Sequence, residues 1–276
     1  MKSILTILLS LLLINLVAQN SKDILFIGNS LTYYHQMPQT LQRMFDANQD
    51  GFKVLQSTYP ALSLQDHCEK MPSPDGKNWR KAAKGEVSPT IQLLKSQSWH
   101  TVILQEASMQ ILIPEAKAAF YDPYIRHLNN IIKTQESKTI LYETYALGEY
   151  PQEYCYPCIM IDAKIDKMQC CSNSFTNSKQ EYRVIKRVYE AAAKKLDAEI
   201  APVGYAFELC RQQYPDIPLQ MDNGDPHPST FGAYLIACVF YQSITQKPAT
   251  EIIYLGGIEK QIAEQLQEIA VAATKS

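Results

Sequence analysis

Strand-like and helix-like segments alternate along most of this chain, and this alternation restricts its fold more than any other feature. Short apolar runs of the kind that form buried strands occupy residues 24–27, 52–55, 101–104, 139–142 and 199–203. Amphipathic segments with helical spacing occupy residues 39–48, 89–97, 116–134, 179–196, 231–245 and 258–273. Strands separated by helical crossovers pair in parallel. The pattern therefore predicts a five-stranded parallel sheet with helices on both faces.

The length and composition fit one large α/β domain. The chain has 276 residues, of which 46% are hydrophobic and 20% charged, so it can bury a sizeable core. No internal repeat or low-complexity linker divides residues 19–276, and we expect a single domain there.

Residues 148–177 are rich in Tyr, Cys and Pro and have no period. A long segment of this kind, directly after the fourth strand, predicts a stapled insertion or a functional loop.

The first 18 residues have the features of an export signal. Lys2 precedes a mostly apolar stretch, residues 4–17, which is short for a membrane span, and Ala18 offers a cleavage point. We expect residues 1–18 to be a cleaved signal peptide and the mature chain to be secreted or periplasmic, with no membrane span after cleavage. The alternative is an uncleaved anchor helix.

The charge and the histidine pattern count against several classes of function. A formal net charge of −2 gives no electrostatic reason to expect nucleic acid or an anionic membrane as a partner. No metal-ligand spacing joins His35, His67, His100 and His127, which we expect to be surface or core residues. The sequence thus predicts a protein without a metal or an organic cofactor.

Four of the seven cysteines lie in the insertion, at positions 155, 158, 170 and 171. In an exported chain such a group favours two disulfides that staple a loop. Zinc is the alternative, although the adjacent Cys170 and Cys171 make an awkward pair of ligands for one tetrahedral site. The spacing does not say which cysteines pair. Cys210 and Cys238 lie in helical, apolar surroundings and fit small core residues.

Two polar clusters, near opposite ends of the chain, supply the parts of a nucleophilic site. A Gly-Asn-Ser sequence ending at Ser30 follows the first apolar run, so a parallel sheet would place this hydroxyl at its carboxyl edge, where open α/β folds bind ligands. The second cluster contains Asp222, Asp225 and His227. A serine nucleophile needs a neighbouring base, and the base needs an orienting group. Ser30 and His227, with Asp225 or alternatively Asp222, form the candidate catalytic set.

These clusters resemble conserved blocks of the SGNH (GDSL-type) hydrolases, in a secreted subgroup whose nucleophile block contains Gly-Asn-Ser. Residues 28–32 resemble the nucleophile block, and residues 225–235 resemble the block that carries the base. Residues 60–67 and 102–108 are similar to the second and third blocks. The resemblance spans essentially the whole mature chain. It implies a flavodoxin-like three-layer α/β/α sandwich and hydrolysis of esters by a serine and a histidine.

Three positions depart from the family's pattern. The second block normally has a glycine whose N–H helps to bind the oxyanion, and here Ala61 stands in its place. The third block normally has an asparagine, and here Gln105 offers the same amide on a longer stem. The family's acid lies three residues before the histidine, where this chain has Gly224, so Asp225 or Asp222 must take that part.

The resemblance implies an oxyanion hole formed by the backbone N–H groups of Ser30 and Ala61 and by the Gln105 side chain. Two of these residues also fit structural roles. Ser30 fits a helix N-cap, and Gln105 fits a side chain that hydrogen-bonds to exposed backbone at the end of the strand. Tyr33 and Tyr34 follow the nucleophile and fit either an aromatic wall for substrate or packing against the first helix.

The leading hypothesis is a secreted serine esterase. Exported relatives in this family often deacetylate glycans, which makes an acylated carbohydrate or another small ester the expected substrate. A lipase, a lysophospholipase or a thioesterase on the same site is the alternative. The displaced acid and the missing second-block glycine motivate a third hypothesis, a non-catalytic glycan-binding relative.

Overall fold

The computed structural model describes residues 22–275. The predicted signal peptide, residues 1–18, lies outside these residues and remains a prediction. All five predicted strands form one parallel sheet in the order β2-β1-β5-β6-β9. Their bounds are β1 Asp23–Gly28, β2 Lys53–Thr58, β5 Thr101–Leu104, β6 Lys138–Tyr142 and β9 Glu199–Ala201.

The central strands are largely apolar, as expected where helices cover both faces of the sheet. Side chains of β1 alternate between two hydrophobic clusters: Ile24 and Phe26 belong to one, and Leu25 and Ile27 to the other. All four residues of β5 are buried. Uninterrupted apolar runs therefore predicted these strands correctly. Alternating apolar and polar residues would instead indicate a sheet with one face exposed to solvent.

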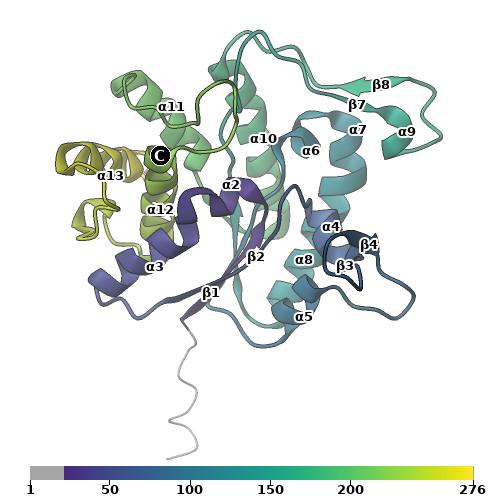
Figure 1. Ribbon diagram of the computed structural model, residues 1–276, viewed down its shortest axis with the longest axis horizontal. Coiled ribbons are helices and arrows are strands. Elements are labelled where there is room, and N and C mark those ends of the chain that lie inside the picture. The colour runs from purple at the N-terminus through teal and green to yellow at the C-terminus, as the bar shows by residue number, and fades with distance from the viewer. Residues whose placement is uncertain (1–21, 276) are drawn as a thin grey trace, which may run out of the picture.

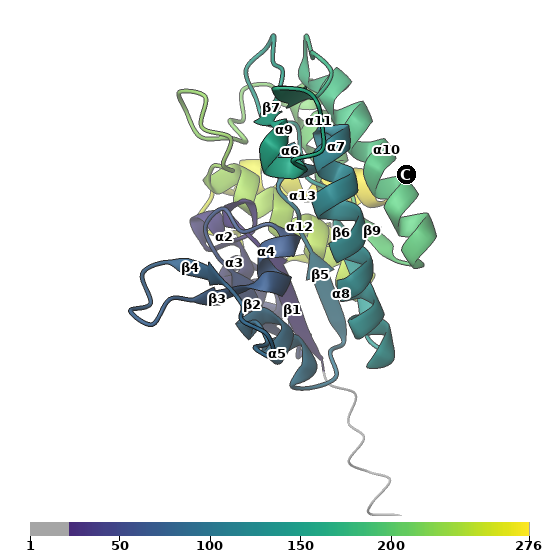
Figure 2. The same cartoon turned by 90° about the vertical axis from the view of Figure 1, so that its right-hand side faces the viewer.

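Two layers of helices complete the sandwich (Figures 1 and 2). The cluster with Phe26 contains side chains from α3 (Met37–Ala47), α11 (Val203–Gln213), α12 (Thr230–Thr245) and α13 (Lys260–Thr274). The cluster with Leu25 contains side chains from α4 (Leu64–Glu69), α5 (Pro89–Lys95), α8 (Asp122–Thr134) and α10 (Ser178–Leu196). The predicted three-layer α/β/α architecture is confirmed.

Short elements connect the main ones. They are α2 (Ser30–Tyr33), η1 (Tyr34–Gln36), α6 (Ser108–Leu112), α7 (Pro114–Ala116), the π-helical turn η2 (Lys117–Tyr121) and η3 (Ala249–Glu251), with a small antiparallel hairpin of β3 (Lys70–Pro72) and β4 (Trp79–Lys81). The predicted strand at residues 199–203 ends early, because Pro202 caps α11, a helix that the sequence analysis did not predict. Proline suits a helix start and lacks the N–H that a strand would use.

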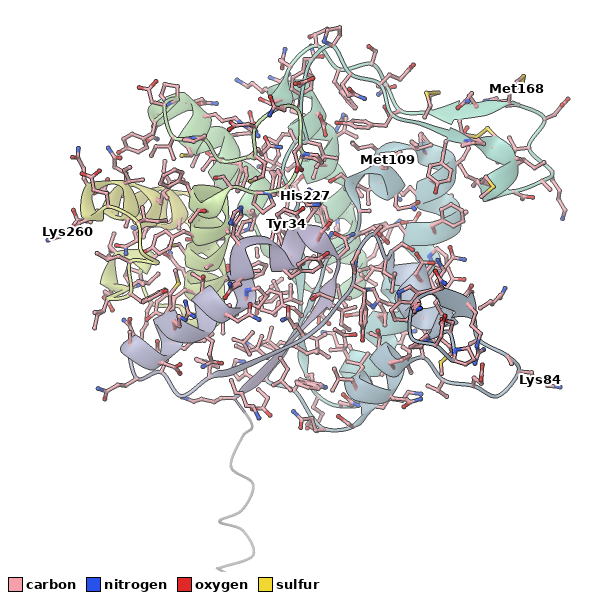
Figure 3. All side chains as sticks on the ribbon, in the orientation of Figure 1. Tyr34, Lys84, Met109, Met168, His227 and Lys260 are labelled. Atoms are coloured by element: carbon pink, nitrogen blue, oxygen red, sulfur yellow. A yellow bond between two sulfur atoms is a disulfide. The ribbon has the colours of Figure 1, made fainter. Side chains whose placement is uncertain are left out.

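The insertion at residues 148–177 forms a second antiparallel hairpin, β7 (Cys155–Pro157) and β8 (Gln169–Cys171), with the short helix α9 (Cys158–Ile161) at its tip. The Cys155–Cys171 disulfide links the two strands and the Cys158–Cys170 disulfide links α9 to β8, so the prediction of disulfides is confirmed (Figure 3). Within residues 22–275 no helix is both long and apolar enough to cross a membrane.

Candidate active site

The nucleophile turn joins β1 to α2 at the carboxyl edge of the sheet. Asn29 has extended backbone (φ −124°) and caps the helix, since its Oδ1 accepts a hydrogen bond from Leu31 N at 3.1 Å. Ser30 is therefore the first residue of α2 rather than its cap. The first N–H groups of a helix have no acceptor inside it, so the Ser30 N–H makes no hydrogen bond within α2.

His227 lies on a loop that precedes α12 and reaches the nucleophile turn from the far end of the chain. An antiparallel bridge between Gln220 and Pro228 closes the loop, and Met221 N donates to His227 O at 2.9 Å. His227 Nε2 lies 2.8 Å from Ser30 Oγ, although the two residues are 197 positions apart. The structure thus brings the predicted nucleophile and base into hydrogen-bond contact.

Asp225 is the aspartate that contacts the histidine. Its Oδ1 lies 2.5 Å from His227 Nδ1 and accepts the His227 backbone N–H at 2.9 Å. These hydrogen bonds, the backbone one first, lower the pKa of the Asp225 carboxyl. Asp222 is exposed and contributes its carbonyl to a turn at Asp225. Asn223 and Gly224 are left-handed (φ +60° and +74°), and this turn brings an acid only two positions from the histidine within reach.

Tyr34 covers one face of the imidazole. The ring centroids of Tyr34 and His227 are 3.8 Å apart and the planes differ by 9° (Figure 3). The base occupies this face of Tyr34, so this face is packed on His227. Tyr33 lies beside it, with ring centroids 6.0 Å apart.

The Pro226 carbonyl anchors the histidine loop to the core. It accepts the Tyr145 hydroxyl at 3.1 Å and Gln220 Nε2 at 3.4 Å. Tyr145 is wholly buried and stacks on Phe207 with ring centroids 4.1 Å apart. No sequence pattern predicted this role for Tyr145. Its position, three residues after the end of a buried strand, was the available indication.

Ala61 lies in the loop between β2 and α4. Its φ of +57° is the left-handed conformation in which glycine is the usual residue, so the backbone keeps the shape that the family's glycine implies. Asn29 Nδ2 donates to Leu62 O at 3.2 Å and ties this loop to the nucleophile turn. Within residues 22–275, neither the Ala61 N–H nor the Ser30 N–H donates to a protein acceptor.

Gln105, which the sequence predicts as an oxyanion donor, is hydrogen-bonded to the nucleophile turn. Its side chain is wholly buried and both ends of its amide are occupied. Oε1 accepts from Asn29 N at 2.7 Å and from Thr32 Oγ1 at 3.0 Å, while Nε2 donates to Glu106 O at 2.7 Å. The amide therefore supports the nucleophile turn, and one of its two Nε2 hydrogens is used by the Glu106 carbonyl. Its oxygen also explains Gly28, where a Cβ would lie 2.5 Å from Gln105 Oε1.

His67 is a core residue, one of the two roles expected of the histidines outside the cluster. Its Nε2 lies 2.9 Å from Gly28 O, which can only accept, so Nε2 carries the proton and Nδ1 accepts from Thr90 Oγ1 at 2.8 Å. Burial lowers the pKa of His67 to about 4, and the ring stays neutral beneath the nucleophile turn.

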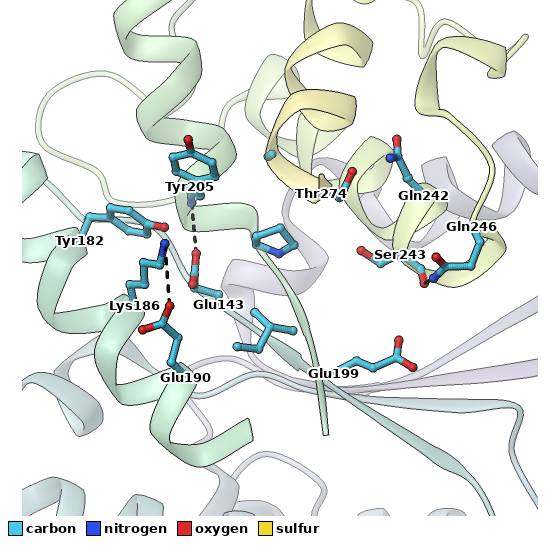
Figure 4. Close-up of a pocket in the computed structure, with 13 residues that line it drawn as sticks. Glu143, Tyr182, Lys186, Glu190, Glu199, Tyr205, Gln242, Ser243, Gln246 and Thr274 are labelled. Atoms are coloured by element: carbon cyan, nitrogen blue, oxygen red, sulfur yellow. Dashed lines mark hydrogen bonds and ion pairs between the residues drawn. The ribbon is translucent and has the colours of Figure 1, made fainter. Parts of the chain in front are cut away.

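Two other clusters of polar groups lie outside this site. Glu153, Cys155 and Cys171 come within 4.8 Å of one another, but a disulfide uses both sulfurs. A pocket of about 260 Å³ opens beside β9 and contains none of the three site residues (Figure 4). Its Lys186 lies 3.8 Å from Glu190 and 5.4 Å above the Tyr205 ring, so these charges are matched within the protein.

Known proteins resemble this chain in their fold but share little of its sequence. No family model matches the sequence, and no curated protein matches it. A DUF4886 family protein from Bacteroides uniformis ATCC 8492 superposes with a TM-score of 0.63 at 17% identity, over 92% of this chain and 94% of that one. A protein from Slackia heliotrinireducens, named as a candidate SGNH hydrolase, superposes with a TM-score of 0.56 at 21% identity, over 82% of this chain and 100% of that one. The chain therefore has the three-layer fold of the SGNH hydrolases, which is the fold that its motifs predicted.

Proposed function

We propose that the protein is an exported serine esterase that hydrolyses acyl esters at Ser30. One observation carries the proposal: an unbroken line of hydrogen bonds from Asp225 through His227 to Ser30, at 2.5 and 2.8 Å. A hydroxyl, an imidazole and a carboxylate in this order form the arrangement by which serine hydrolases generate a nucleophile at neutral pH. Two disulfides in the insertion fit an oxidising compartment and so favour export.

The geometry gives each group a part in acyl transfer. His227 Nε2 takes the proton from Ser30 Oγ as that oxygen attacks the ester carbonyl carbon. Asp225 keeps the other ring proton on Nδ1 and stabilises the imidazolium that forms. The imidazolium then protonates the leaving alcohol. Water, activated by the same nitrogen, attacks the acyl enzyme and releases the acid and free Ser30.

The developing oxyanion would accept hydrogen bonds from the backbone N–H groups of Ser30 and Ala61. Both lie at the carboxyl edge of the sheet, and neither has a protein acceptor among the described residues. One such donor typically accelerates acyl transfer by ~10²–10³-fold. The site we propose therefore relies on two backbone donors, while the Gln105 amide, in the place of the family's asparagine, hydrogen-bonds to the nucleophile turn and to Glu106 O.

The substrate class that we favour is an acylated carbohydrate. This choice rests on the resemblance to exported SGNH hydrolases, which often remove acetyl groups from glycans. Lipases, lysophospholipases and thioesterases use the same catalytic groups, so the acyl-chain preference distinguishes them. A glycan-binding protein without activity is the remaining alternative.

The decisive experiment compares wild type with Ser30→Ala on p-nitrophenyl acetate and on acetylated xylo-oligosaccharides. We expect Ser30→Ala to lose about 10⁴-fold or more in kcat with little change in folding, because the nucleophile is absent. A fluorophosphonate should label wild type at Ser30 alone. Equal rates for the two proteins would end the proposal. A steep rise in rate from acetyl to decanoyl esters would instead favour a lipid substrate.

A further inference from the structure

The two residues that follow β5 contact the two halves of the site. Gln105 holds the nucleophile turn through Asn29 N at 2.7 Å and Thr32 Oγ1 at 3.0 Å. Its own Nε2 donates to the Glu106 carbonyl at 2.7 Å, which fixes the amide's orientation. This side chain is wholly buried, so each of its hydrogen bonds is made in a region from which water is excluded.

Glu106 reaches in the other direction, toward the loop that carries Ala61. Its Oε2 accepts the N–H of Leu64 at 3.1 Å, and its Oε1 accepts the N–H of Ala107 at 2.7 Å. Leu64 is the first residue of α4 and lies three positions after Ala61. The carboxyl is 0% exposed, and burial raises its pKa to about 8. Burial of a carboxyl group is unfavourable unless its oxygens are hydrogen-bonded, and here they accept from two backbone N–H groups.

One further hydrogen bond closes a ring between the two halves. Asn29 Nδ2 donates to Leu62 O at 3.2 Å, so the nucleophile turn and the Ala61 loop touch directly. The ring runs from the end of β5 through Gln105 to Asn29, across to Leu62, and back through Leu64 to Glu106. Ser30 and Ala61, the two residues with open N–H groups, are each held next to this ring.

We propose that Gln105 and Glu106 are positioning residues that together fix the spacing between the Ser30 turn and the Ala61 N–H. The inference rests on the proposed esterase function for its catalytic consequence, and on the hydrogen bonds alone for its structural one. Oxyanion donors act only when they lie about 2.7–3.1 Å from the developing charge, and a displacement of about 1 Å can cost ~10²-fold in rate. Ala61 is in a backbone conformation that alanine does not favour, so its loop needs such support.

The first test is Glu106→Gln, with Glu143→Gln as the matched control. Glutamine has one acceptor oxygen, so either Leu64 N or Ala107 N loses its partner. Glu143 is also buried, follows the neighbouring strand β6 and accepts a helix N–H, that of Tyr205 at 3.2 Å, but it does not contact the Ala61 loop. We expect Glu106→Gln to lower kcat about tenfold to 100-fold with KM within about twofold. Glu143→Gln should keep kcat within about twofold.

A second pair of variants tests the Leu64–Glu106 hydrogen bond without altering Glu106. Leu64→Pro deletes the N–H at the first helical position, where proline is well accommodated and where Ser63 already has the extended backbone that precedes proline (ψ 169°). Leu64→Ala also loses core packing of the leucine side chain but keeps the N–H. We expect Leu64→Pro to have a kcat about tenfold below that of Leu64→Ala.

Amide hydrogen exchange tests the structural part whether or not the wild type is an esterase. Exchange of residues 59–66 should rise at least about tenfold in Glu106→Gln and stay unchanged in Glu143→Gln. Unchanged exchange in Glu106→Gln, or equal losses of kcat in the two glutamate variants, would overturn the proposal. If wild type shows no hydrolysis that depends on Ser30, the proposed function fails, while the exchange result still decides whether the ring holds the loop.

Discussion

His227 is held on three sides by other side chains. Ser30 Oγ and Asp225 Oδ1 fix the two ring nitrogens, and Tyr34 lies flat against one face. Two hydrogen bonds define the axis of an imidazole but leave the ring free to tilt about that axis. The stacked tyrosine removes this freedom, and its π face attracts the positive charge that the ring gains during catalysis.

We therefore expect Tyr34→Leu to lower kcat by about threefold to tenfold, because leucine fills the space without a π face. Tyr34→Phe keeps the face and should stay within about twofold of wild type. Steady-state kinetics on p-nitrophenyl acetate measure both. Equal losses in the two variants would assign the effect to the Tyr34 hydroxyl, against the stacking argument.

At the scale of elements, the site depends on where strands stop. β1 ends at a glycine because the Gln105 amide occupies the space that a side chain at Gly28 would need. β9 ends at Ala201 because Pro202 begins α11, and the Gly204 N–H then donates to Glu143 O at 3.0 Å. These two strand ends therefore contact neighbouring segments at the edge where the loops carry the reactive groups.

The disulfide hairpin is an element that we expect to be separable from catalysis. The base of the insertion is held by Glu181, which accepts Leu147 N at 3.0 Å and the hydroxyls of Tyr150 and Tyr154 at 2.7 and 3.1 Å. None of these hydrogen bonds needs the cysteines.

Reduction of both disulfides should therefore increase the rate of proteolysis within residues 155–171 several-fold, because the hairpin loses its cross-links. Hydrolysis of p-nitrophenyl acetate should change by no more than about twofold. The measurement is limited trypsin digestion with peptide mapping, beside an activity assay of the same sample. A large loss of activity on reduction would show that the hairpin shapes the site.

At the scale of the whole molecule, two buried glutamates make stability depend on pH. Burial raises the pKa of Glu106 to about 8 and that of Glu143 to about 7, whereas both ionise near 4.5 in the unfolded chain. Between these values the folded protein holds protons that the unfolded chain has released. Their contribution to stability is complete below about pH 4.5 and is lost as the pH rises through 7 and 8. His67, with its pKa lowered to about 4, acts in the opposite direction, but only below about pH 6.5.

The free energy of unfolding should accordingly fall between pH 6.5 and 8. Each glutamate that is still protonated in the folded state contributes a slope of about −1.4 kcal/mol per pH unit. Glu106→Gln should remove about that much of the slope near pH 7. Urea denaturation at several pH values measures it, and a slope unchanged by the substitution would show that Glu106 is ionised in the folded protein.

The fold and the two ends of the site could be predicted from the sequence because they depend on local patterns. Apolar runs of four or five residues mark strands that are buried on both faces, and helical spacing marks the segments that cover them. A Gly-Asn-Ser sequence after such a run places Ser30 at the carboxyl edge, and His227 followed by a helix supplies its partner. None of these inferences needs the direction of a distant side chain.

Tertiary structure alone decided the directions of side chains and the shapes of turns. Two left-handed residues between Asp222 and Asp225 place Asp225, and not Asp222, against the histidine. The register of one hairpin determines how the four cysteines pair. Gln105 turned toward the nucleophile turn because Asn29 N and Thr32 Oγ1 lie there, although its place in the sequence fits an oxyanion donor equally well. The hydrogen-bond partner of each of these side chains depends on which polar groups come into contact when residues far apart in sequence pack together. A local sequence pattern does not contain that information.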